Sequence, residues 1–463
     1  TRGAPAFFTA DISGSISDVL RLIDMEPLGY ASRFGIEPDK VVGNAALRFD
    51  VIVPMLKELK VADVTFDIDA DVTGLALERG PRYSLSDGNF AFAITGDALS
   101  ADGTARLNGV AAAIKWDEDF GARTGANSTR MVIATRLDGV SRTALGLPEG
   151  RITGTIGLNI TTEGSGMLIR AVDADVDFAD ASLTLPELDW QKLPGEAGRL
   201  NVRLEWPESE PMRVRALSYA GTGAELRGSA SFGPDGQLET LALDRAILGP
   251  ENDFTATVAR TPNGYAVNAS GARISATGIL RDLMRGNDDG TPALDWRIAA
   301  RFDRLVLRGQ ALSGAIIEAE TLGGALAALR LDGAFDGEVL AGRLTNMGTD
   351  GRQLTVSTRN AGALMRAATG FESMIGGDLR LTMTLPPLAL ASIGEGDQAN
   401  LPATRGRLRI NEFRITDQPF FSRLFAAGSL TGIADLMSGE GITFTALDVP
   451  FSSKDSLITI EGA

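Results

Sequence analysis

The sequence contains neither histidine nor cysteine among its 463 residues. These two absences exclude Ser-His-Asp and Cys-His catalysis, HExxH zinc sites and structural zinc held by Cys or His. The chemistries left to an enzyme use carboxylates, Lys, a Ser-Lys pair or Tyr. A cysteine-free composition fits an extracytoplasmic bacterial protein without disulfides, although cytosolic proteins can also lack Cys. The commonest hydrolase and metal-site chemistries are therefore ruled out.

Aromatic residues and long apolar runs are also scarce. Aromatics make up 6% of the chain against 44% hydrophobic residues, so the apolar content is mostly Leu, Ala, Val and Ile. No run of about 18 apolar residues predicts a membrane-spanning helix. The chain starts at Thr1 without an initiator Met or a signal-peptide pattern and stops on a strand-like segment. We therefore expect it to be an internal piece of a longer protein.

Positive charge is sparse and scattered. The formal net charge is −16 and the Arg residues occur singly through the strand-like segments. Like charges repel along such a surface, which argues against nucleic acid and anionic lipid headgroups as partners of the outer surface. We expect no nucleic-acid partner.

One segment illustrates the pattern of the whole chain, namely Asp63–Thr73 with the sequence DVTFDIDADVT. Apolar and acidic or Thr residues alternate strictly, and successive side chains of a strand point to opposite faces. The segment therefore predicts a strand with one apolar and one acidic face. At roughly 3.4 Å per residue it would be about 37 Å long, roughly twice the usual strand. Its apolar side chains are those of Val64, Phe66, Ile68, Ala70 and Val72.

The same alternation recurs along the chain. The segment Ile152–Ile160 is predicted as one strand, and Val172, Val176 and Phe178 alternate with acidic residues in the next one. The apolar phase then flips at Ala181, which predicts a β-bulge. The other predicted strands include 45–53, 88–94, 103–116, 201–206, 212–217, 226–232, 296–307, 379–385, 407–415 and 457–460.

Helical patterns are few. On the order of twenty or more strands would accompany four or five short helices, so helices cannot cover the apolar faces. A second sheet, closure into a barrel, or a trough filled with apolar ligand could cover them. Scattered aromatics disfavour a membrane barrel, and both a sandwich and a lipid-filled trough stay open. The predicted helices are 17–23, 28–34, 278–285, 361–374 and 419–437.

Three acidic segments are candidates for chemical sites. Asp117 and Asp119 could converge as carboxylates, but a solvated strand end explains them more simply. Asp173, Asp175 and Asp177 could chelate calcium, but the Gly and the bidentate Glu of a calcium loop are missing. The segment 287–290, reading NDDG, predicts a loop. We expect no metal site and no cofactor.

Three segments resemble the AsmA-like superfamily, in particular its YhdP-type branch. The similarity is one of pattern, without any catalytic motif, and covers about half of the chain. The family's N-terminal membrane helix and the rest of its C-terminal region have no counterpart in these residues. The similar segments are Asp18–Leu56 with its helical pattern before a Gly-Asn strand, Gly103–Arg199, and Thr404–Ser453, which begins TRGRLRINEFRITDQPF and resembles the start of the AsmA-like C-terminal region.

The resemblance implies a mostly β, elongated, twisted antiparallel repeating β-groove with a few short helices. Residues 1–400 would form the groove and residues 401–463 the beginning of the C-terminal region. It also implies a non-enzymatic, monomeric conduit, anchored to the inner membrane and facing the periplasm of a Gram-negative bacterium. Phospholipid acyl chains would be its ligand, and the inner and outer membranes its partners through parts outside this chain.

Two further functional classes remain open from the sequence. One is a structural envelope protein with sheets packed face to face and no ligand, and the other, less favoured, is a carboxylate-based hydrolase. The predicted helix 419–437 could lie on a membrane interface or cap the sheet. The residues expected to line a lipid groove are Val64, Phe66, Ile68, Ala70, Val72, Ile152, Ile156, Leu158, Ile160, Val172, Val176 and Phe178.

Overall fold

The computed structural model describes most of the chain. The described residues are 5–25, 36–56, 63–79, 83–122, 127–147, 150–166, 168–207, 210–285, 294–388, 404–416, 441–454 and 457–460. The predicted helices 28–34 and 419–437 and the predicted loop 287–290 lie outside them. The described part is mostly β with a few short helices, which confirms the predicted fold class.

The chain divides into two compact units, and each is described by itself. The first contains Thr1–Thr184, Gln191–Thr222 and Ser229–Gln237, and the second contains Leu185–Trp190, Gly223–Gly228 and Leu238–Ala463. The boundary predicted at residue 400 rests on the family resemblance, and stays a prediction.

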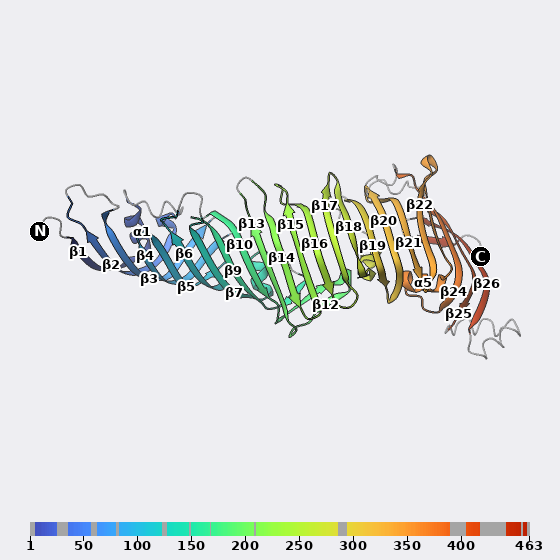
Figure 1. The fold of residues 1–463 in the computed structure, drawn as a ribbon, viewed down its shortest axis with the longest axis horizontal. Helices are drawn as coiled ribbons and strands as arrows, with labels where there is room; N and C mark the ends of the chain where they lie inside the picture. The colour runs from blue at the N-terminus through green and yellow to red at the C-terminus, as the bar shows by residue number, and fades with distance from the viewer. Residues whose placement is uncertain are drawn as a thin grey trace. The chain divides into compact units, whose positions relative to one another are not determined.

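The first unit contains a long antiparallel meander. Each of its sheet strands pairs antiparallel with the next one in the order listed here, and Figure 1 shows β1 to β7 side by side in that order. The strands are β1 (Ala6–Ser15), β2 (Val41–Val53), β3 (Thr65–Arg79), β4 (Tyr83–Thr95), β5 (Ala98–Leu107), β6 (Val110–Asp119), β7 (Thr129–Leu137), β9 (Ile156–Ser165), β10 (Leu168–Asp177), β13 (Gly198–Glu205) and β14 (Arg213–Gly221).

A hairpin replaces the single strand predicted over 103–116. β5 and β6 are joined at Asn108-Gly109, where φ is 48° and 82°. Both residues thus lie in the left-handed region that a two-residue hairpin turn requires, and Asn-Gly is the sequence that favours this turn. The prediction was wrong because the alternation continues through the turn and hides it.

The helices of the first unit lie at one end of its strands. α1 (Ile16–Asp24) begins at Ser15, whose hydroxyl accepts a hydrogen bond from the Ser17 amide. Its Val19 and Leu20 pack against Val41 and neighbouring apolar residues of the sheet. α1 confirms the helix predicted over 17–23. α3 (Gly139–Ala144) follows β7 at the same strand end.

A small three-stranded sheet is separate from the meander. It consists of β8 (Ile152–Gly154), β11 (Ala181–Leu185) and β12 (Trp190–Lys192). The predicted single strand Ile152–Ile160 was therefore wrong, because β8 and β9 belong to different sheets. The phase flip at Ala181 is likewise not a bulge: β10 ends at Asp177, and β11 pairs with β8.

The second unit also follows a meander, with one exception. β18 and β19 are parallel, with Val267 opposite Ile298. The chain passes from β18 into α4 (Thr277–Arg285), and a parallel pair requires such a crossover. The predicted fully antiparallel sheet is therefore corrected to a mixed one. The strands are β16 (Leu238–Leu248), β17 (Asp253–Thr261), β18 (Gly264–Ser275), β19 (Asp295–Leu307), β20 (Gln310–Leu322), β21 (Ala325–Phe335), β22 (Glu338–Asn346), β23 (Arg352–Thr358), β24 (Met374–Leu385), β25 (Thr404–Ile415), β26 (Ile442–Lys454) and β27 (Leu457–Ile460); β15 (Ala224–Phe232) has residues in both units.

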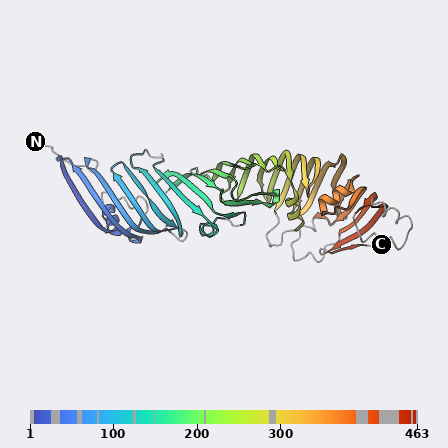
Figure 2. The ribbon, with the colours of Figure 1, turned by 90° about the horizontal axis from the view of Figure 1, so that it is seen from below.

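The core of the second unit lies at the strand ends near its helices. α5 (Ala361–Thr369) is capped by Asn360, whose side chain accepts from the Ala363 amide. Ala363 and Ala367 of α5 are fully buried against Phe302, Phe335 and Leu340. Figure 2 shows how strongly the strands of this unit bend. The helix predicted over 361–374 is thus confirmed but ends earlier, at Thr369, before the left-handed Gly370.

Candidate functional site

The alternation of each strand is aligned across the sheet of the first unit. Strand registers place Leu47 opposite Ala70, and Ala70 opposite Phe92. We call the side that carries these residues the apolar face and the opposite side the outer face. One row of the apolar face crosses eleven strands through Ile12, Leu47, Ala70, Phe92, Ala101, Trp116, Met131, Thr162, Val172, Leu204 and Val214.

A second aligned row runs beside the first. It contains ten residues, nearly all of them apolar, and the one register shift between the two rows, in the β13–β14 pair, leaves Leu204 opposite Val214. A one-residue slip would have moved a whole strand's apolar set to the outer face. The row is Ala45, Val72, Phe90, Gly103, Ile114, Ile133, Ile160, Ala174, Val202 and Leu217.

The apolar face of the first unit is buried unevenly. Near the α1 and α3 end of the strands, which we call the floor, Val72 is 3% and Leu137 0% exposed. Toward the other end, which we call the rim, Phe66 and Ile68 of β3 are only half-buried, whereas Leu99 is 9% and Glu118 5% exposed. A dry core between packed sheets would bury the whole of β3, so the apolar face is partly open at this strand.

The second unit repeats this arrangement. One apolar row crosses its strands without interruption, including the parallel pair. Its floor lies at the α5 end, where Phe335 is 1% and Leu340 2% exposed. The row is Leu243, Ala256, Ala269, Ala300, Ile317, Leu331, Gly342, Val356, Leu381, Leu408 and Val449.

The contacts between strands also indicate sheets of one layer. Among the described strands, the extensive strand-to-strand contacts join hydrogen-bonded neighbours. The observations therefore favour the trough over the sandwich.

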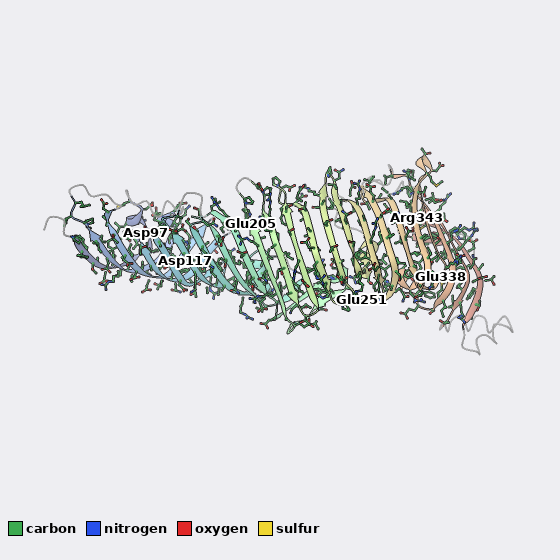
Figure 3. The ribbon with its side chains drawn as sticks, in the orientation of Figure 1. Asp97, Asp117, Glu205, Glu251, Glu338 and Arg343 are labelled. Atoms are coloured by element: carbon green, nitrogen blue, oxygen red, sulfur yellow. The ribbon has the colours of Figure 1, made fainter. Side chains whose placement is uncertain are left out.

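Ion pairs between strands cover the outer face. Asp173 pairs with Arg203 at 2.8 Å, and Asp175 pairs with Arg199 at 2.9 Å. No group of three or more metal-ligating residues exists in the part of the chain that the structure describes. The acidic stripe at Asp173 and Asp175 is thus an ion-paired part of the outer surface. Figure 3 marks Asp117 and Glu205 on this sheet.

The second unit has its own ion-paired cluster on the outer face. Asp332 accepts hydrogen bonds from Arg343 at 2.5 Å and from Arg330 at 2.8 Å. These two guanidinium groups lower the pKa of Asp332 below its ordinary value. The outer faces of both units are therefore charged, ordered and solvated.

Two hollows are lined by residues of both strand faces. One, of about 580 Å³, is lined by Ala256 and Ala300 of the apolar row and by Glu318 of the outer face. The other, of about 510 Å³, is lined by Ala70 of the apolar row and by its outer-face neighbours Asp69 and Asp71.

The predicted lining residues fall into three groups. Two departed from the prediction: Ile152 lies on β8 in the small sheet, opposite Leu183, and Phe178 lies beyond β10, 4% exposed and edge-on to Tyr219 at 6.3 Å. Two of the others, Val72 and Ile156, are buried at the floor. The remaining eight are half-buried on the apolar face: Val64, Phe66, Ile68, Ala70, Leu158, Ile160, Val172 and Val176.

Sequence reasoning left out many residues of the same rows. Phe92, Trp116 and Ile133 lie in line with Ala70 or Ile160 but were not predicted as lining. Their own strands show the same alternation. The Asn108-Gly109 turn sets how β5 pairs with β6. Applying the two-residue period to every strand would have found them.

One acidic residue interrupts the apolar face. Glu118 is 5% exposed and lies opposite Thr129, whose hydroxyl donates to it at 2.5 Å. The neighbouring Asp117 and Asp119 are exposed on the outer side, as a solvated strand end requires. The three carboxylates therefore do not converge.

Comparison with known families, with curated proteins and with solved structures finds no match to this chain. Within the described residues, no helix is both long and apolar enough to cross a bilayer.

Proposed function

We propose that this chain is a segment of a non-enzymatic lipid conduit, with phospholipid acyl chains lying on its apolar faces. The observation that carries the proposal is the alignment of mainly apolar side chains, many of them only half-buried, in rows that cross each unit. Such contiguous apolar surface is rare on soluble proteins and marks a binding surface. Each methylene buried there stabilises the complex by about 0.8 kcal/mol, so acyl chains are suitable occupants.

The chemistry of the lining supports this ligand. The rows consist mainly of Leu, Ile, Val and Ala, which make non-directional contacts. A long chain of methylenes can shift along such a surface without losing a specific hydrogen bond. Following the AsmA-like resemblance, we place the whole protein in the periplasm, anchored to the inner membrane, moving phospholipid between the two membranes as a monomer.

Mass spectrometry of the purified chain under native conditions, followed by lipid extraction, tests this proposal. We expect co-purifying phospholipid. Combining Ile68→Asp and Ile160→Asp should remove the lipid while the protein stays folded, because both side chains are half-buried. Thr65→Asp, on the exposed outer side of β3, is the matched control and should keep the lipid.

The second candidate is a structural envelope protein without a ligand. The buried floors and the ordered ion pairs of the outer face would suit such a role. Absence of phospholipid at any stoichiometry, in a folded preparation, would favour it over the conduit.

A further inference from the structure

The rim of the second unit carries a row of a different chemistry from the rest of its apolar face. Arg260 on β17 lies opposite Tyr265 on β18, and Tyr265 lies opposite Trp296 on β19. Glu239 on β16 is the next residue in the row and forms an ion pair with Arg260 at 3.7 Å. Because these four residues share the parity of Val258, Val267 and Ile298, they stand on the apolar face, at its rim.

The aromatic members of this row form a contact pair at the surface. The rings of Tyr265 and Trp296 lie 5.7 Å apart at 35°, and Trp296 is 38% exposed. Tyr and Trp combine a large apolar body with one polar group, and they favour boundaries between apolar and wet surroundings. The pair therefore marks a boundary where a ligand can change from apolar to polar.

Arg260 lies on the opposite face from several ion-paired arginines of this unit. Arg297, Arg330 and Arg343 lie on the outer face and pair there with acidic neighbours. Arg260 lies on the apolar face, with 30% of its side chain exposed, and its partner Glu239 is 52% exposed. The pair places one cation and one anion at the rim of the apolar face of the second unit.

We propose that Glu239, Arg260, Tyr265 and Trp296 bind the headgroup of a zwitterionic aminophospholipid; this inference rests on the proposed lipid conduit. The guanidinium of Arg260 matches the phosphate, to which it can donate two parallel hydrogen bonds. The carboxylate of Glu239 matches the ammonium group. The glycerol region contacts Tyr265 and Trp296, and the acyl chains extend over the rows below.

Charge complementarity selects this headgroup over two alternatives. A phosphate without an ammonium group would add negative charge beside Glu239 in a chain whose net charge is −16. A diacylglycerol has no phosphate to which Arg260 could donate. The four side chains thus favour phosphatidylethanolamine over phosphatidylglycerol and over diacylglycerol.

A competition experiment tests the preference. The full chain is equilibrated with vesicles containing equal amounts of these three lipids, re-isolated, and its bound lipids are measured by mass spectrometry. We expect phosphatidylethanolamine to dominate. Arg260→Gln should lower the ratio of phosphatidylethanolamine to diacylglycerol by about tenfold, the effect of losing a charged hydrogen-bonding partner. Glu239→Gln should raise the share of phosphatidylglycerol.

Matched controls are available on the outer face of the same unit. Arg297→Gln and Glu320→Gln break an ion pair of the same composition at 2.9 Å and should leave the lipid ratios unchanged. Arg260→Lys keeps the charge but loses the forked geometry, and should give an intermediate ratio.

The total amount of bound lipid separates the two proposals. If lipid binds but the ratios are the same in wild type, Arg260→Gln and Glu239→Gln, the headgroup site is overturned while the conduit stands. If folded wild type binds none of the three lipids, the conduit proposal itself fails.

Discussion

Glu118 accepts a hydrogen bond from the hydroxyl of Thr129 across the β6–β7 pair, at 2.5 Å, and both residues are 5% exposed. The indole of Trp116 also donates to the Glu118 carboxylate, at 3.4 Å. A buried carboxylate on an otherwise apolar face is tolerated only with such partners. The hydrogen-bonding requirement of the Glu118 carboxylate is thus met within the β6–β7 pair.

Thr129→Val should be destabilising for this reason. The substitution keeps the shape of the side chain but removes the donor, and a buried group without its partner costs about 1–3 kcal/mol. Thr129→Ser keeps the hydroxyl and is the control. Urea denaturation of the variants checks the difference, and equal midpoints for Val and Ser would contradict it.

Lys192→Met should also destabilise the protein. The Lys192 side chain is 2% exposed, and its ammonium group donates to the carbonyls of Phe178, Ala181 and Leu193 at 2.6, 2.9 and 3.0 Å. Methionine leaves these carbonyls without that donor, at about 1–3 kcal/mol for each buried acceptor that finds no other partner. Hydrogen exchange should show faster exchange in β11 and β12.

A surface lysine provides the control for this variant. Lys115 pairs with Asp102 at 2.8 Å, and both side chains are 66% exposed. Exposed ion pairs contribute little, so Lys115→Met should leave the melting temperature nearly unchanged. A similar fall in melting temperature in both variants would contradict the stabilising role of the buried hydrogen bonds of Lys192.

Asp332 should make the stability of the protein depend on pH at acidic pH values. Hydrogen bonds from Arg343 and Arg330 lower its pKa in the folded state. A carboxylate whose pKa is lowered by folding binds protons more tightly in the unfolded state. Its contribution to the free energy of unfolding is therefore present above the unfolded pKa of about 3.9, and it is lost as the pH falls through the lower folded pKa. Asp332→Asn should therefore lower the melting temperature at pH 7.

The difference between wild type and Asp332→Asn should shrink as the pH falls below about 4, because protonated Asp resembles Asn in charge. Melting curves between pH 7 and strongly acidic pH check this. A difference that stays constant over the whole range would contradict the assigned ion-pair origin.

Gly278→Ala should reverse the usual effect of this substitution in a helix. Replacing glycine by alanine inside a helix normally stabilises by about 1 kcal/mol. At Gly278, in α4, a Cβ atom would lie 1.9 Å from the carbonyl oxygen of Pro186. Forced repacking of this kind typically costs about 1–3 kcal/mol, so we expect a lower melting temperature.

Gly139 offers the matched control in α3. A Cβ atom there would come no closer than 3.8 Å to any other group, the nearest being the Arg142 guanidinium. Gly139→Ala should thus be neutral or slightly stabilising. A stabilising Gly278→Ala would contradict the close approach of α4 to Pro186.

Sequence reasoning was most successful where the local pattern decides the structure. The alternation of Asp63–Thr73 predicted the two faces of β3, and the structure finds Phe66 and Ile68 half-buried and Asp67 exposed. The short helix over 278–285 was predicted almost to its ends, since α4 covers Thr277–Arg285. These properties depend on neighbours within one segment.

Long-range pairing was less predictable. The separation of Ile152 from Ile156 depends on Leu183, some thirty residues further on, which pairs with β8. The parallel pairing of β18 with β19 likewise depends on where the crossover through α4 returns the chain. Neither partner can be read from the alternation of the strand concerned.

The sequence by itself determined that the chain is mostly β, that its strands have one apolar and one charged face, and that its helices are too few to cover them, because these properties follow from side-chain period and composition. Only the tertiary structure decided which residues of the apolar faces are buried and which are only half-buried. It also decided that Arg260, Tyr265 and Trp296 share one row. The physical reason is that burial and cross-strand neighbours depend on the register between strands. That register is determined jointly by residues that are distant in the chain.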